Sequence, residues 1–233
     1  MPTDFVYLGH STFYVKTGNN TNILIDPWID NNPSYPKEYK LEKVDILLIT
    51  HGHFDHIGDA VRVAKEYKPK VVCVFETSVW LNKKGVENTL PMNKGGTQTV
   101  NGIKITMVSA DHSCGILDDD GSIIYGGEPC GYVVTLEDGF IFYHAGDTNV
   151  FNDMKTISLL YKPKLALLPI GDLYTMSPKE AAYACSLLKP KMVIPMHYGT
   201  FPVLTGTPEE LKRLVRKIKV KVIELKPGET KSF

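Results

Sequence analysis

The chain has 233 residues, which is enough for one large domain with a substantial apolar core. Its 26 Lys and Arg residues balance 26 Asp and Glu residues, so the basic excess typical of nucleic-acid-binding proteins is absent. No apolar run approaches the ~20 residues needed to cross a bilayer, and the polar N-terminus does not indicate a signal peptide. We therefore expect neither a membrane segment nor a nucleic-acid partner.

The first part of the chain predicts β-structure. Short runs rich in β-branched and aromatic residues occur at residues 5–8, 12–16 and 22–25. A Gly-Asn-Asn turn at residues 18–20 joins the second and third runs, which is typical of an antiparallel β-meander. Residues 44–49 are apolar apart from one aspartate, and they predict a strand that is buried on both faces.

Helices and strands alternate in the remainder of the chain. A helix is expected over residues 55–66, and Pro69 prevents it from continuing further. Two later helices share a start signal: Ser177 and Thr207 are predicted N-caps, and each precedes a proline at the first helical position. Glu180 completes a capping box with Ser177. Further strands are predicted, in chain order, at residues 71–75, 103–108, 131–136, 140–143, 165–168, 192–195 and 220–225.

Both halves of the chain therefore begin with strands and end in strand–helix alternation. This order predicts an α/β (α+β) fold, a sandwich of two mixed β-sheets with helices on the outer faces. No linker, low-complexity tract or repeat interrupts it, so residues 1–233 are predicted to form a single domain. The four cysteines, including a small buried thiol expected at Cys114, show no CxxC pairing and favour a reducing, cytoplasmic location.

Histidines follow five of the predicted strands. His10, His51, His112, His144 and His197 each lie at or just beyond the end of an apolar run. In layered α/β architectures, ligands bind at the carboxyl ends of strands, where loops bring distant residues together on a rigid base. The sequence therefore predicts one site that several loops build together.

The densest group is the His-Gly-His-Phe-Asp-His motif that begins at His51. Imidazole and carboxylate groups are the ligands that borderline metals such as Zn²⁺ prefer. Gly52 permits the tight backbone path that lets His51 and His53 point the same way. Asp55 and His56 lie where the chain turns into a helix, so they are expected to point differently. Ligands aimed in two directions indicate two metal ions rather than one.

This motif, with His112, Asp147 and His197 further along the chain, resembles the motif series of the metallo-β-lactamase superfamily. The flanking sequence resembles its branch of uncharacterised metal-dependent hydrolases, which is related to ascorbate-phosphate lactonase. The segments that carry this second resemblance are residues 8–11, 24–27, 144–148, 168–172 and 195–200. The resemblance covers nearly the whole chain and implies the four-layered αββα fold.

The resemblance also implies two sets of metal ligands. Metal one takes His51, His53 and His112, metal two takes Asp55, His56 and His197, and Asp147 bridges the two ions. Similar proteins carry a histidine after the Gly-Asp pair of a late strand, where this chain has Leu173. If that histidine touches substrate in those proteins, the specificity of this protein is expected to differ.

Five more residues are predicted to support this site. Asp26 is expected either to accept a hydrogen bond from a ligand imidazole or to form a turn, and Asp172 has the same two interpretations. His10 is expected to contact the substrate or donate a proton to it. His144 is expected behind the ligands, and Tyr198 against the substrate.

The predicted function is a metal-dependent hydrolase in which a metal-activated water attacks a small ester, lactone or phosphodiester. Two divalent ions, Zn²⁺ foremost with Mn, Fe and Ni left open, combine with two carboxylates and a hydroxide to leave about +1 of charge, which favours an anionic small-molecule substrate. Asp147, Asp55 and His10 are the predicted catalytic residues. A nuclease of the RNase Z type and a diiron redox or sensor module are the alternatives, and a homo-oligomer is left open.

Overall fold

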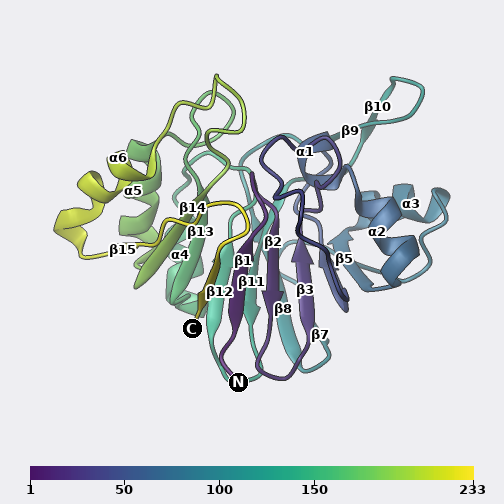
Figure 1. The fold of residues 1–233 in the computed structure, drawn as a ribbon, viewed down its shortest axis with the longest axis horizontal. Helices are drawn as coiled ribbons and strands as arrows, with labels where there is room; N and C mark the ends of the chain where they lie inside the picture. Colours follow the sequence, from purple (N-terminus) through teal and green to yellow (C-terminus); the bar gives the residue numbers. More distant parts are fainter.

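Two seven-stranded mixed sheets packed face to face form the centre of the protein in a computed structural model that describes residues 1–233 (Figure 1). The strands of the first sheet are β1 Asp4–Tyr7, β2 Phe13–Lys16, β3 Asn22–Ile25, β4 Ile46–Leu48, β5 Lys70–Val74, β6 Thr89–Met92 and β16 Thr230–Ser232. Their order is β16-β1-β2-β3-β4-β5-β6. The pairs from β3 to β6 are parallel, and the others are antiparallel.

The second sheet repeats this plan with the antiparallel strands first in the chain. Its strands are β7 Thr97–Val100, β8 Ile103–Ser109, β11 Cys130–Thr135, β12 Ile141–His144, β13 Leu165–Pro169, β14 Met192–Met196 and β15 Lys221–Val222. Their order is β15-β14-β13-β12-β11-β8-β7, and the pairs from β12 to β15 are parallel. A small hairpin of β9 Gly115–Leu117 and β10 Ile123–Tyr125 projects from the body (Figure 1).

Helices cover the outer face of each sheet. Beside the first sheet lie α1 Phe54–Ile57, α2 Ala60–Tyr67 and α3 Phe75–Lys83; beside the second lie α4 Met154–Tyr161, α5 Pro178–Leu188 and α6 Pro208–Val215, which a 3-10 turn at Arg216–Ile218 extends (Figure 1). None of these helices combines the length and apolar character needed to span a membrane. The layers run helix, sheet, sheet, helix, which confirms the predicted αββα sandwich.

Alternation along the strands explains why the layers form. In β1, Phe5 belongs to the core between the sheets, whereas Val6 belongs to the core beneath the helices of the first half. In β4, Ile46 faces the inner core and Leu47 the outer one. Successive side chains of a strand point to opposite faces, so a strand covered on both sides must be apolar throughout. The predicted doubly buried strand is therefore confirmed as β4, although it covers only Ile46–Leu48 of the expected residues 44–49.

The single helix expected over residues 55–66 is wrong, because the chain forms α1 and α2 with a break at Asp59. The Asp59 carboxylate accepts the N–H groups of Ile29 at 2.6 Å and of Asp30 at 2.9 Å. The Asp59 N–H donates to the Pro27 carbonyl at 2.9 Å. These contacts come from a distant loop, so no local signal could have placed the break.

The last predicted strand is also shorter than expected. Of residues 220–225, only Lys221 and Val222 form a strand, β15. Ile223 and Leu225 belong to the core between the sheets. The chain then returns to the first sheet as β16, which pairs with β1. The sequence did not predict the helices α3 and α4 or the strands β6, β7, β9, β10 and β16.

Tyr132 on β11 joins the two sheets just below the metal-ligand motif. Its hydroxyl donates to the Ile49 carbonyl at 2.8 Å and lies 3.2 Å from the Val72 carbonyl. Thr50 is held in the same place, because its carbonyl accepts the Cys130 N–H at 3.0 Å. The end of β4, and with it the start of the motif, is therefore fixed from the opposite sheet.

We expect Tyr132→Phe to lower the free energy of unfolding by about 1–3 kcal/mol, because the buried Ile49 carbonyl then loses its donor. Urea denaturation of both the variant and the parent measures this difference. Tyr143→Phe is the matched control, since Tyr143 is equally buried but its hydroxyl has no hydrogen-bond partner. Equal losses in the two variants would contradict the proposed role of the cross-sheet bond.

Candidate metal centre

Loops at one edge of the sandwich bring the predicted ligands together. His51 and His53 follow β4, His112 follows β8, and Asp147 follows β12. His197 comes directly after β14, while α1, which lies at this edge of the sandwich, contributes Asp55 and His56 (Figure 1). All seven predicted ligands therefore lie at the carboxyl ends of strands or in the short helix beside them, where ligands bind in layered α/β proteins.

The first group contains only imidazoles. The Nε2 atom of His51 lies 3.0 Å from Nδ1 of His53, and Nε2 of His112 lies 3.3 Å from the same Nδ1. One ring nitrogen from each of the three histidines falls within 4.8 Å of the others. Three uncharged imidazoles whose nitrogens converge in this way are a common ligand set for a divalent metal ion.

The second group surrounds Asp147. Its Oδ2 lies 3.0 Å from Nε2 of His197 and 3.2 Å from Nε2 of His56. The same oxygen is 3.9 Å from Nε2 of His51 and 3.8 Å from Nε2 of His112. Asp147 thus lies near histidines of both groups.

The donor set fits bound cations. Nε2 of His56 and Oδ1 of Asp147 are buried and lack any hydrogen-bond partner. A buried polar atom without a partner costs about 1–3 kcal/mol, and most proteins avoid it. Imidazole nitrogens and carboxylate oxygens are the ligands that Zn²⁺ prefers, so a divalent ion between these groups would give Nε2 of His56 the partner that it lacks.

Burial and charge shift the pKa values of these groups in opposite directions. Burial lowers the pKa of His51, and the neighbouring His56 lowers it further. Burial also opposes charge on His56, but Asp147 and Asp26 outweigh it and hold its pKa well above the usual value. In the same way Asp147 raises the pKa of His197 to about 9. Protons on His56 and His197 therefore balance Asp147 when no metal is bound.

Asp26 orients His56 from behind. Its Oδ2 accepts from Nδ1 of His56 at 2.8 Å and from the Thr50 hydroxyl at 2.7 Å, while Oδ1 accepts the Thr50 N–H at 2.8 Å. A carboxylate on one ring nitrogen fixes the tautomer and directs the other nitrogen at the metal. This geometry is the first of the two interpretations offered for Asp26, although its φ of 49° also places it in a tight turn.

His10 lies behind Asp55 and does not line the cavity described below. Its Nε2 is 2.9 Å from Oδ2 of Asp55, and its Nδ1 is 3.0 Å from the Thr200 hydroxyl. Burial, together with His197, lowers the pKa of His10 to about 4, so the ring is neutral. A neutral ring that donates from Nε2 and accepts at Nδ1 fits both contacts. His10 also falls in a group with Asp55, His56 and His197 that could hold a metal ion.

His144 and Cys114 support the loops rather than the cavity. Nε2 of His144 donates to the Ser11 carbonyl at 3.2 Å, and its Nδ1 accepts the Gly146 N–H at 3.1 Å. The buried Cys114 sulfur accepts the Gly52 N–H at 3.3 Å, inside the ligand motif. The sequence indicated a buried thiol at Cys114 but not this contact.

Asp172 and Tyr198 lie away from the ligands. The Asp172 carboxylate accepts the N–H of Leu173 at 2.8 Å within its own turn. Tyr198 packs against the apolar cluster beneath the helices of the second half and does not line the cavity. The structure therefore brings together the seven predicted ligands with His10 and Asp26, and it places His144 behind the turn that precedes Asp147.

A cavity of about 700 Å³ opens directly over the ligands. Its lining comprises five ligands and six other residues, which are His53, Asp55, His112, Asp147, His197, Phe54, Ser113, Tyr174, Phe201, Pro202 and Val203. Ser113 reaches Nε2 of His53 at 3.2 Å. The six additional residues were not predicted as site residues, because only the folded loops place them beside the ligands.

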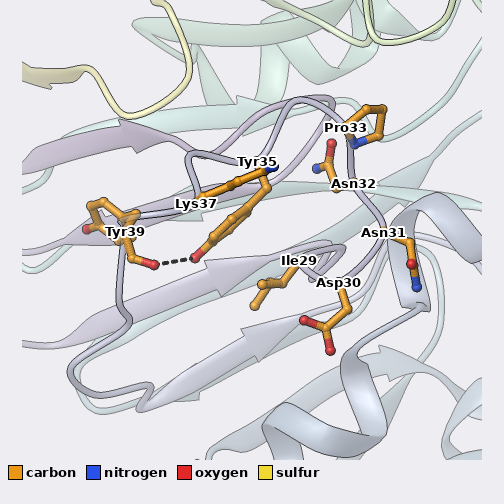
Figure 2. Close-up of a pocket in the computed structure, with 8 residues that line it drawn as sticks. All are labelled: Ile29, Asp30, Asn31, Asn32, Pro33, Tyr35, Lys37 and Tyr39. Carbon is orange, nitrogen blue, oxygen red and sulfur yellow. Dashed lines mark hydrogen bonds between the residues drawn. The ribbon is translucent and has the colours of Figure 1, made fainter.

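A second hollow lies apart from the ligands, in the loop between β3 and β4 (Figure 2). Its volume is about 520 Å³, and residues 29–39 supply its walls. Across it the Tyr35 hydroxyl donates to the Tyr39 carbonyl at 3.2 Å. It contains none of the groups that could hold a metal ion, so the chemistry belongs to the first cavity.

Comparisons with known proteins agree with this geometry. The family model described as "Beta-lactamase superfamily domain" matches residues 21–198. The chain is 59% identical to a UPF0173 metal-dependent hydrolase of Koribacter versatilis over 96% of this chain and 95% of that protein. It is 55% identical to another from Solibacter usitatus, over 97% of each. Igni18, a metallo hydrolase from Ignicoccus hospitalis, superposes with a TM-score of 0.86 and 38% identity over 100% of this chain and 99% of that chain.

The chain therefore belongs to the metallo-β-lactamase superfamily and, within it, to the UPF0173 family of metal-dependent hydrolases. The resemblance inferred from the motifs is confirmed. The clusters of histidine and aspartate at the strand ends are its candidate metal-binding groups.

Metal binding is expected to release protons at neutral pH. The pKa of His56 is well above 6.5 and that of His197 is about 9 without metal, so both must lose a proton before their Nε2 atoms can bind an ion. The apparent Zn²⁺ affinity should therefore rise with pH up to about 9. Calorimetric titration of metal-free protein in buffers of different ionisation enthalpy counts the protons. Identical binding enthalpies in every buffer would rule this out.

Asp26→Asn is expected to weaken Zn²⁺ binding by roughly 10–100-fold, because the charge that orients His56 is removed. Competition with a chromophoric chelator measures the affinity. Asp45→Asn is the control, since Asp45 also accepts a backbone N–H, that of Asn22 at 2.9 Å, but pairs with Lys43 away from the ligands. Equal affinity in the two variants would show that Asp26 serves the turn alone.

Proposed function

We propose that the protein is a binuclear hydrolase that cleaves a small ester, lactone or phosphodiester. The position of Asp147, within reach of both ligand groups and with Oδ1 free, carries this proposal. Metal one would be held by His51, His53 and His112, and metal two by Asp55, His56 and His197, with Asp147 between them. Zn²⁺ suits these ligands first, and Mn, Fe or Ni would also be accommodated.

Two bound divalent ions would supply a water nucleophile at neutral pH and would polarise the oxygen of the substrate that gains negative charge. The chain supplies the remaining functions. Oδ1 of Asp147 would hold the nucleophile in line with the reacting carbon or phosphorus and accept its proton. The same atom would then pass that proton to the leaving oxygen. His10, expected earlier to contact substrate, would instead keep Asp55 oriented through the 2.9 Å contact.

The anionic character expected of the substrate belongs, in this proposal, to the reacting group itself. Two bound divalent ions would outweigh the charges of Asp55 and Asp147, so negative charge that develops at the reacting centre would be stabilised. We further propose that one domain carries out the reaction in the cytoplasm, because all four cysteines are free and buried.

Asp147→Ala should lower kcat/KM on the order of 10³-fold or more while the protein stays folded, because both ions and the nucleophile lose their shared ligand. The measurement combines metal quantification with turnover of a γ-lactone, 4-nitrophenyl acetate and bis(4-nitrophenyl) phosphate, and circular dichroism confirms the fold. Asp153→Ala is the control, since Asp153 is exposed and makes no capping bond. Unchanged turnover in Asp147→Ala, or purified protein that binds no divalent metal, would refute the proposal.

A further inference from the structure

The wall of the cavity opposite the metal ligands is apolar. Apart from five ligands and Ser113, the lining residues are Phe54, Tyr174, Phe201, Pro202 and Val203. Phe54 is 56% exposed, Tyr174 61% and Val203 48%. Exposed apolar side chains that gather beside a polar site commonly mark a surface that a ligand covers.

This wall is formed before any ligand arrives. The buried Trp28 lies beneath it, with its ring 5.7 Å from that of Phe54 in an edge-to-face arrangement and 5.9 Å from that of Phe201. The Phe201 ring also lies 6.0 Å from that of His10, whose position Asp55 fixes. Aromatic pairs at these separations stabilise one another. The apolar wall is therefore anchored to the metal-ligand network.

The loop after β13 brings Tyr174 to the rim of the cavity. Asp172 and Leu173 both adopt left-handed backbone conformations, with φ of 66° and 53°. The Asp172 carbonyl accepts the Tyr174 N–H at 2.6 Å, and its carboxylate accepts that of Leu173. A branched residue such as leucine rarely adopts this conformation, and such strain is typically retained where a loop serves a ligand.

With metal bound, the cavity would offer no other cation. None of its lining residues is lysine or arginine, and two of them, Asp55 and Asp147, are acidic. Arg62 lies in the adjoining hollow behind Phe54, where Asp59 at 2.8 Å, Asp30 at 3.2 Å and Glu66 at 3.5 Å already pair with it. A carboxylate or phosphate on the distal part of a substrate would be desolvated here without a partner, which is costly.

We propose that the non-reacting part of the substrate is an uncharged alkyl or aryl group that packs against Phe54, Phe201 and Val203. This inference rests on the proposed hydrolase function, and it narrows the substrate to one whose non-reacting part is hydrophobic. For an ester or lactone, water cleaves the acyl C–O bond: the acyl carbon gains the hydroxyl, and the leaving oxygen gains the proton. The apolar group takes no part in these bonds and contributes binding energy only.

Two measurements test the proposal, one of them independent of catalysis. The first is binding of the neutral fluorescent probe N-phenyl-1-naphthylamine to metal-free protein. The second is the kcat/KM ratio of metal-loaded protein for 4-nitrophenyl octanoate against 4-nitrophenyl acetate. We expect the parent to bind the probe and to prefer the octanoate by about tenfold or more, because its longer chain buries additional apolar surface.

Val203→Asp should weaken probe binding about tenfold or more and abolish the preference for the longer chain. Phe54→Ala, which introduces no charge, should lower both values in the same direction. Leu160→Asp is the matched control: Leu160 is an exposed leucine on α4, so its replacement should change neither value. Circular dichroism verifies that each variant is folded.

The outcomes separate the two proposals. If probe binding is lost in Val203→Asp but no ester, lactone or phosphodiester is turned over with any metal, the hydrolase function fails and the apolar site stands. If turnover is metal-dependent but probe binding and chain-length preference are the same in Val203→Asp and Leu160→Asp, the apolar site fails. Faster cleavage of a 4-nitrophenyl ester with a terminal carboxylate than of the octanoate would also overturn it.

Discussion

The structure depends on a buried carboxylate that must be matched by positive charge. Asp147 is almost fully buried, and its Oδ2 lies within 3.2 Å of two imidazole nitrogens. An unpaired charge in such a place costs several kcal/mol. Protons on His56 and His197 supply the balancing charge in the absence of metal, and bound metal would replace them. The same constraint therefore accounts for the raised pKa values of these histidines and for the fit of the site to metal.

Hydrogen bonds from both sheets fix the candidate metal-binding residues in position. Tyr132 reaches across from the second sheet to the end of β4, where the ligand motif begins. Asp26 holds His56 and Thr50 together, and the Cys114 sulfur holds the Gly52 N–H. Each of these supports comes from a different segment of the chain. Ligands that rest on several strands keep their geometry better than ligands carried by one flexible loop.

The cavity lining combines polar and apolar residues. The inner side concentrates imidazoles and carboxylates, which suits a reaction in which charge develops at a carbonyl or phosphoryl centre. The outer side is aromatic and aliphatic, and Trp28 braces it against the ligand network. An apolar wall without lysine or arginine supports selection by hydrophobic area rather than by ion pairing.

Local sequence patterns predicted the sandwich, and the dense histidine motif together with the family resemblance predicted the candidate metal-binding residues. Period-two alternation, proline positions and the dense histidine motif depend on neighbouring residues, so they can be recognised along the chain. The break at Asp59, the sulfur contact of Cys114 and the wall around Phe201 could not be recognised. In each case the partner lies far away in sequence: Ile29 for Asp59, Gly52 for Cys114 and Trp28 for Phe201. Residue types and spacing thus determined which chemistry the chain can carry out, whereas long-range contacts between loops, which have no periodicity, decided the shape of the cavity that this chemistry serves.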